Sequence, residues 1–167
     1  MKLIRILAAV IVAQLAGHAC AQQIMTEGAA EQDKKLSLLF SPYTNHFSYD
    51  VEHKNVWMVG VEREHPDGRV DGITVFTNSF GQPSVYVYPW GGVYHAIGGI
   101  KGLSFKWSAG LIYGYVDSYQ NKVPLNYKGF SPGVVPALAY EFIPGWSAQL
   151  DVLGTAGLMF QLNVALK

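Results

Sequence analysis

Apolar and polar residues alternate with a period of two along most of the chain beyond residue 34. In residues 103–115 the odd positions are apolar or aromatic, and the even positions are mostly small or polar. Residues 56–64 and 157–167 repeat this pattern. A period of two is typical of β-strands that bury one face. We therefore expect eight strands, at residues 35–42, 55–65, 69–78, 83–96, 103–115, 132–142, 147–154 and 157–166.

The segments between these strands differ in length in a regular way. Those near residues 66–68, 98–102 and 143–146 are short and contain Pro or Gly, which is typical of tight turns. Segments 43–54 and 116–131 are long and polar. Short turns at one end and long loops at the other are typical of bacterial outer-membrane barrels, which have an even number of strands. The predicted fold class is all-β, an eight-stranded antiparallel transmembrane β-barrel.

The composition favours strands in lipid over a soluble domain. Half of the residues are hydrophobic and only 14% are charged, yet beyond the N-terminal segment no apolar run approaches the roughly 20 residues of a membrane helix. A soluble eight-stranded barrel of the lipocalin type would alternate in the same way and is the alternative. Aromatic residues on the presumed outer face favour lipid contact, because aromatic girdles mark both membrane interfaces. These residues are Trp57, Phe105, Trp107, Tyr113 and Tyr115.

The first residues have the features of a secretory signal peptide. Lys2 and Arg5 form a basic start, residues 6–15 form an apolar stretch, and residues 19–21 (Ala-Cys-Ala) form an A-x-A cleavage site. We expect cleavage after the second of these alanines. A lipidated Cys20 is the alternative, but the residues before this cysteine fit lipidation poorly.

The sequence therefore predicts three parts, namely a signal peptide (1–21), a polar N-terminal segment (22–34) and an outer-membrane β-barrel (35–167). The chain has twelve Lys and Arg and twelve Asp and Glu, so without Lys2 and Arg5 it has ten basic and twelve acidic residues, a formal charge of −2. This balance does not predict a nucleic-acid partner. The only cysteine lies in the signal peptide, so thiol chemistry is not expected in the mature protein. We expect a monomer of the bacterial outer membrane, inserted by the barrel assembly machinery.

Three residues at one rim of the predicted barrel form a candidate acyl-transfer site. If the first strand runs outward, the first and second outer connections share a rim, and His46 lies near Asn78 and Ser79. A histidine can remove a proton from a hydroxyl that attacks an ester, and an asparagine can hold the imidazole or donate to the oxyanion. The plainer interpretation is a solvated histidine and an Asn-Ser turn. We expect no cofactor, and no set of His, Cys or carboxylates has metal-ligand spacing.

Two prolines at the start of the sixth strand suggest how a lipid would enter the barrel. Pro132 and Pro136 lie four residues apart. Proline has no N–H, so it removes a ladder hydrogen bond and is normally excluded from paired strands. We expect a lateral gap for acyl chains beside this strand, opening into an interior with room for one small ligand. The alternative is that the prolines only begin the strand or shape a turn.

Four segments resemble, in order, an outer-membrane enzyme family. They look like the divergent branch of lipid A palmitoyltransferases found in pseudomonads and related bacteria, and the similarity covers roughly residues 35–167. The segments are YTNHFS (43–48), VFTNSFGQPS (75–84), residues 114–126 and residues 132–138.

This resemblance implies an eight-stranded barrel that transfers a palmitoyl chain from a glycerophospholipid to a hydroxyl of lipid A. The family's catalytic histidine would fall on His46, and its Asp/Asn-Ser pair on Asn78 and Ser79. The better-known enterobacterial branch has an acid before the serine, and the asparagine here argues against a charged triad. Two other functions remain open. They are a non-enzymatic barrel for envelope integrity or adhesion, and a lipid A deacylase.

Overall fold

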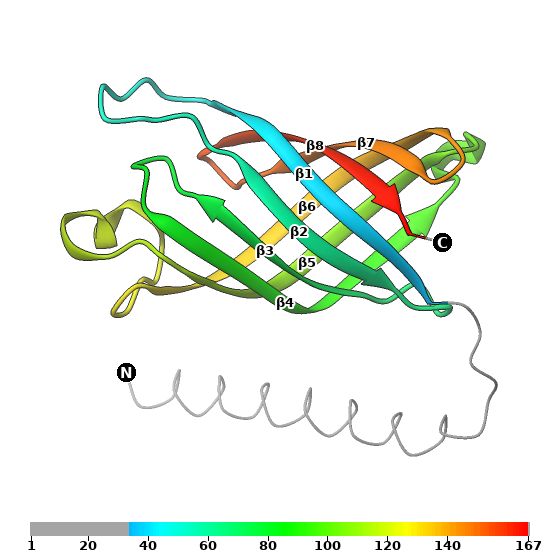
Figure 1. The fold of residues 1–167 in the computed structure, drawn as a ribbon, viewed down its shortest axis with the longest axis horizontal. Coiled ribbons are helices and arrows are strands. Elements are labelled where there is room, and N and C mark those ends of the chain that lie inside the picture. The colour runs from blue at the N-terminus through cyan, green and yellow to red at the C-terminus, as the bar shows by residue number, and fades with distance from the viewer. Residues whose placement is uncertain (1–33, 167) are drawn as a thin grey trace, which may run out of the picture. The chain divides into compact units, whose positions relative to one another are not determined.

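The computed structural model describes residues 34–166, in which eight antiparallel strands close into a barrel (Figure 1). Each strand pairs with its neighbour in sequence, and β8 returns to pair with β1. This confirms the predicted all-β, eight-stranded antiparallel barrel. The strands are β1 (Lys35–His46), β2 (Met58–Glu64), β3 (Val70–Thr77), β4 (Pro83–His95), β5 (Leu103–Tyr113), β6 (Phe130–Ile143), β7 (Trp146–Val152) and β8 (Gly157–Ala165), with 3₁₀ turns η1 (Ile97–Gly99) and η2 (Asp117–Lys122).

The largest difference from the predicted boundaries is at the end of β1. The sequence predicted a strand ending at residue 42, but β1 continues to His46, which pairs with Gly157 of β8. The β1–β8 ladder shifts register between Phe40 and Tyr43, and this irregularity carries the strand past its proline. His46 therefore ends a strand instead of lying in a loop. The predicted signal peptide and nearly all of the polar N-terminal segment lie outside the described residues.

The two faces of the barrel wall differ as the alternation predicts. In β8, Met159, Gln161 and Asn163 face inward and are buried, whereas Phe160 between them is exposed. The other strands also expose large apolar side chains, so the outer face of the barrel is mainly apolar. No helix within residues 34–166 is long and apolar enough to cross a membrane.

The connections divide the barrel into two ends. One end, which we call the loop rim, carries the two longest connections and lies at the left of Figure 1. Its segments are 47–57, 78–82, 114–129 and 153–156. The other end, the turn rim, carries the connections at 65–69, 96–102 and 144–145, none of which exceeds seven residues. We call the parts of the barrel interior next to these two rims the loop half and the turn half.

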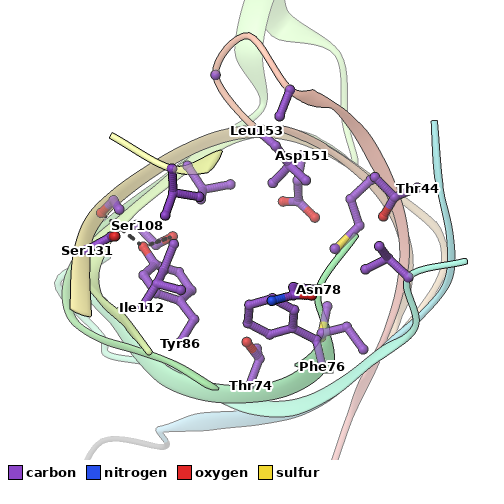
Figure 2. Close-up of a pocket in the computed structure, with 18 of the residues that line it drawn as sticks. Thr44, Thr74, Phe76, Asn78, Tyr86, Ser108, Ile112, Ser131, Asp151 and Leu153 are labelled. Carbon is purple, nitrogen blue, oxygen red and sulfur yellow. Dashed lines mark hydrogen bonds between the residues drawn. The ribbon is translucent and has the colours of Figure 1, made fainter. Parts of the chain in front are cut away.

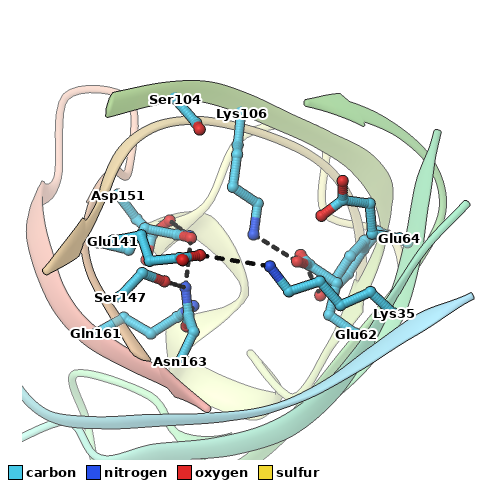
Figure 3. A network of polar contacts seen from close by, with 12 residues as sticks. Lys35, Glu62, Glu64, Ser104, Lys106, Glu141, Ser147, Asp151, Gln161 and Asn163 are labelled. Atoms are coloured by element: carbon cyan, nitrogen blue, oxygen red, sulfur yellow. Dashed lines mark hydrogen bonds and ion pairs between the residues drawn. The ribbon is translucent and has the colours of Figure 1, made fainter. Parts of the chain in front are cut away.

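Polar side chains fill the middle and the turn half of the interior (Figure 3). Lys106 pairs with Glu62, which also accepts a hydrogen bond from the Tyr88 hydroxyl at 3.1 Å. Gln149 Nε2 donates to an Asp151 oxygen at 2.6 Å, and Asn163 Nδ2 donates to Gln149 Oε1 at 2.9 Å. Buried polar groups that satisfy one another in this way form a rigid packing unit. We call it the turn-half network: Glu62, Tyr88, Lys106, Gln149, Asp151, Gln161 and Asn163.

The ladder between β6 and β7 is incomplete at the loop rim. β6 pairs with β5 continuously from Phe130 to Tyr140, but its first pair with β7 is between Ala137 and Asp151. Residues 131–136 therefore have no partner on the β7 side. We call this opening the β6–β7 gap.

A second ladder also stops short of the loop rim. The last pair between β1 and β2 joins Ser41 to Met58, and β1 continues beyond it. Here a side chain bridges the strand and the following loop, because Asn55 Nδ2 donates to the Pro42 carbonyl at 3.3 Å.

Candidate functional site

The loop half of the barrel encloses a cavity of about 390 Å³, which we call the slot (Figure 2). Its walls come from most of the strands and from the segments at the loop rim. Apolar side chains cluster on the side formed by β1, β2, β3 and β8, with Leu39, Val56, Met58, Phe76, Leu153 and Met159 in contact there. The floor of the slot is formed by those members of the turn-half network that line the cavity, including Asp151.

His46 and Ser79 meet at the mouth of the slot. The Nε2 atom of His46 lies 2.7 Å from the Ser79 hydroxyl oxygen, and both residues line the cavity. They are 33 residues apart in sequence. A backbone hydrogen bond of 2.8 Å from Lys54 N–H to the Ser79 carbonyl ties the two loops together. The expectation that a histidine and a serine share this rim thus agrees with the geometry.

Asn78 is close to the pair but does not contact His46. Its side-chain nitrogen donates to Gln82 Oε1 at 3.1 Å and to the Gly114 carbonyl at 3.0 Å. Its side-chain oxygen accepts from the N–H groups of Phe80 and Gln82, each at 3.0 Å. These bonds use both donors and both acceptor sites of the amide. Asn78, only 1% exposed, therefore shapes the loop that presents Ser79.

His53 is a second histidine at this site, and the sequence offered no pattern to select it. Its ring lies 4.3 Å from the ring of His46, between centroids. His46 forms the last pair of the β1–β8 ladder, so it lies at the loop rim, where β1 ends. Burial lowers the pKa of His46 below its usual range, and the charge of the neighbouring His53 lowers it further. A neutral imidazole is the form that accepts a proton from a serine.

Tyr115 also lies beside the serine. The sequence pattern placed it on the outer face of a strand, but β5 ends at Tyr113 and Tyr115 lines the slot. Burial raises the pKa of the Tyr115 phenol, and a hydrogen bond with Ser79 offsets part of this rise. The phenol is therefore protonated at neutral pH and able to donate a hydrogen bond.

An aromatic and ionic cluster lies at the loop rim, where Lys122 lines the slot. The Phe80 ring stacks on Tyr119 at 4.3 Å between centroids, and the Lys122 ammonium lies 5.0 Å from the centre of the Phe80 ring. Lys122 also donates to Asp50 at 3.2 Å. A hydrogen bond from the Glu52 N–H, followed by the bond from Lys122, lowers the pKa of the exposed Asp50 carboxyl. This cluster joins the loops after β1, β3 and β5, and through Phe80 it contacts His53 beside His46.

Pro132 and Pro136 lie in the unpaired part of β6. The N–H of Glu141 donates to the Gly102 carbonyl at 2.9 Å, so odd-numbered positions of β6 direct their backbone groups toward β5. Because these groups alternate along a strand, the backbone nitrogens of both prolines face the β6–β7 gap. The prolines therefore cost no hydrogen bond with β5. Residues 131–135 on one side and 153–156 on the other line the slot, which extends to the gap.

Within residues 34–166, no group of three or more His, Cys, Asp or Glu is arranged to hold a metal ion. No protein-family model matches the chain, and a search of curated proteins finds no match. The resemblance to lipid A palmitoyltransferases therefore stays a prediction.

Proposed function

We propose that this protein is an outer-membrane acyltransferase that moves a palmitoyl chain from a glycerophospholipid to lipid A. The observation that carries the proposal is the 2.7 Å contact between His46 and Ser79 at the mouth of the slot. A nucleophile within hydrogen-bond reach of a base is the core of acyl-transfer sites. The apolar wall of the slot suits a hydrocarbon chain, and the apolar outer face of the barrel suits a lipid bilayer.

The proposed reaction has two steps. In the first, His46 takes the Ser79 proton while the serine oxygen attacks the ester carbonyl, and the lysophospholipid alcohol leaves with that proton. In the second, a lipid A hydroxyl gives its proton to His46 and attacks the acyl-serine, and Ser79 leaves as the hydroxyl. Tyr115, which lines the slot beside Ser79, is the proposed donor to the oxyanion that forms in each step. Asn78 acts by holding the serine loop.

The β6–β7 gap is the proposed entrance for the acyl chain. A lipid in the outer leaflet approaches the barrel from the side, whereas a closed ladder has no lateral opening. Pro132 and Pro136 have no backbone N–H to donate on the β7-facing edge of β6, which disfavours pairing with a neighbouring strand there.

Mass spectrometry of lipid A, from cells with and without the gene, tests this function. A gain of one palmitoyl chain that depends on the gene, and is absent with Ser79→Ala, supports transfer. The loss of a chain would instead assign a lipid A deacylase, which shares the same histidine and serine but uses water as the acceptor. Unchanged lipid A would favour a barrel that serves envelope integrity or adhesion.

Cell fractionation tests the location separately. We expect extraction only by detergent and heat-modifiable migration on gels, because every strand of a closed barrel is held by two neighbours. Recovery of the protein from the soluble periplasmic fraction would contradict the membrane location.

A further inference from the structure

The barrel interior contains two cavities, one behind the other. The slot of about 390 Å³ lies in the loop half, and a second cavity of about 300 Å³, which we call the turn-half cavity, lies in the turn half. Exposed residues line each cavity at its own rim, namely residues 154–156 for the slot and Ala96 and Lys101 for the turn-half cavity. Among the described residues, Glu62 alone lines both cavities. The two cavities therefore approach each other at the level of Glu62.

An ion pair crosses the lumen at this level. Lys106 of β5 pairs with Glu62 of β2, two strands that are not neighbours in the barrel, so the side chains meet across the interior (Figure 3). The two side chains are only 12% and 10% exposed. Lys106 lines the turn-half cavity, whereas Tyr88, which donates to Glu62 at 3.1 Å, lines the slot. The pair thus stands at the boundary between the two cavities.

Side chains, and not the wall, decide whether this boundary is open. The interior of an eight-stranded barrel is just wide enough for its side chains to fill. The wall itself is fixed by continuous pairing of β2 with β3 around Glu62 and of β5 with its two neighbours around Lys106. A change in which partner Lys106 contacts would therefore open or close the lumen without any change in the strands.

Asp151 offers Lys106 a second partner inside the lumen. Its carboxyl group on β7 is 5% exposed, lines the slot and accepts a hydrogen bond from Gln149 at 2.6 Å. A carboxylate has about four acceptor sites, so it has room for an ammonium as well. In the view of Figure 3, Lys106 lies between Glu62 and Asp151. The flexible stem of a lysine allows its ammonium to turn from one carboxylate to the other.

We propose that the barrel also contains a gated pathway for small monovalent cations, which joins the slot to the turn-half cavity. The pathway is closed when Lys106 pairs with Glu62 and open when Lys106 turns to Asp151. Two carboxylates and one ammonium leave a formal charge of −1 at the boundary. Charged side chains at a constriction select the ion of opposite sign, so cations pass and anions are excluded. This activity goes beyond acyl transfer and does not depend on it.

Single-channel recording of the purified protein in phosphatidylcholine bilayers tests the proposal. We expect the wild-type barrel to be closed most of the time. Lys106→Ala leaves Glu62 without its partner, so the fraction of time open should rise on the order of 100-fold, as loss of one member of a buried ion pair implies. In a KCl gradient, the reversal potential of this variant should show a preference for K⁺ over Cl⁻. Equal currents from the wild type and Lys106→Ala, or a preference for Cl⁻, would overturn the inference.

Two further variants separate a gate from a general loosening of the barrel. Exchanging the charges, by Glu62→Lys together with Lys106→Glu, keeps the ion pair and should leave the barrel closed. Lys35→Ala is the matched control, because it breaks the 3.6 Å pair of Lys35 with Glu141, which also joins non-neighbouring strands but lies at the turn rim. That variant should also stay closed. Opening by either variant as large as that of Lys106→Ala would overturn the inference.

The state of the protein is checked by heat-modifiable migration before each recording. If Lys106→Ala does not fold, Lys106→Met replaces it, because methionine keeps most of the apolar stem and removes the charge. The same opening is expected, and a folded Lys106→Met barrel that stays closed would contradict the gate. Lipid A analysis measures acyl transfer independently of ion currents, so failure of the pathway and failure of the transfer function are separate results.

Discussion

The barrel contains two histidine–serine pairs, one in each half. In the loop half, His46 Nε2 lies 2.7 Å from the Ser79 hydroxyl. In the turn half, His95 Nδ1 lies 2.9 Å from the Ser104 hydroxyl, and His95 Nε2 lies 2.8 Å from a Glu64 oxygen. By distances alone, the turn-half pair is closer to a Ser–His–acid triad, because it includes the carboxylate.

The surroundings of the two pairs favour the opposite assignment. The turn-half pair borders a cavity of about 300 Å³ whose walls are mostly charged or polar. An acyl chain there would take these groups out of water without compensation. The charged residues are Lys35, Glu62, Glu64, Lys101, Lys106 and Glu141. The loop-half pair instead opens onto the apolar cluster of the slot.

The two halves also differ in how their polar groups are satisfied. In the turn half, ion pairs and hydrogen bonds join the side chains to one another (Figure 3). In the loop half, the buried hydroxyls of Thr44 and Ser131 have no hydrogen-bond partner within residues 34–166. The polar groups of the turn half thus bind one another, whereas the loop half leaves a cavity beside its histidine and serine. A histidine beside a serine is therefore informative about function only together with the space next to it.

Loss of either member of the loop-half pair should have the largest effect. We expect His46→Ala and Ser79→Ala each to lower acyl transfer on the order of 10²–10⁴-fold, because proton transfer to a positioned base contributes about that much. His95→Ala is the matched control, and its turnover should be unchanged. Lipid A labelling in detergent, normalised to heat-modifiable protein, measures both. Wild-type turnover with Ser79→Ala, or a large loss with His95→Ala, would exchange the roles of the two halves.

Closing the β6–β7 gap should also reduce transfer strongly. Continuing the register of the Ala137–Asp151 pair places Val135 opposite Leu153, so cysteines at these two positions would join the strands across the gap. We expect the disulfide form to transfer poorly, because the acyl chain cannot enter from the side, and reduction to restore the rate.

The control for this cross-link is a cysteine pair at Tyr140 and Ala148, which already face each other in the paired part of β6 and β7. Oxidation of that pair should leave the rate unchanged. Equal rates for the oxidised and reduced Val135–Leu153 protein would mean that lipid enters elsewhere.

A smaller effect should follow from Asn78→Asp. If Asn78 stood for the acid of a triad, this change would preserve or raise activity. The geometry predicts the reverse, because the new carboxylate oxygen would face Gln82 Oε1 and the Gly114 carbonyl, where the amide now donates. Leaving buried acceptors unpaired costs about 1–3 kcal/mol. We expect a lower unfolding temperature together with reduced turnover, whereas full activity at wild-type stability would restore the triad interpretation.

The fold followed from local pattern, but only part of the site did. A period of two located all eight strands, because each strand buries one face, and the order of the strands placed His46 and Ser79 at one rim. The pattern misplaced Tyr115 because β5 ends at Tyr113, and the next residue, Gly114, has a φ of 139°. The contact of His53 with His46 and the loop bonds of Asn78 depend on how loops cross in space, which periodicity does not encode.

The smallest predicted effect concerns the pH dependence of transfer. Burial and the charge of His53 both lower the pKa of His46, so the base stays neutral, and transfer stays active, to a lower pH than with an ordinary histidine. His53→Ala removes the charge and exposes the ring face of His46, and both changes raise its pKa toward the usual value. The acid limb of the kcat/KM profile should therefore move to higher pH, while the rate at pH 8 changes little. An unmoved acid limb would mean that another group controls the protonation of the site, whereas a shift toward lower pH would contradict the direction of the coupling between the two histidines.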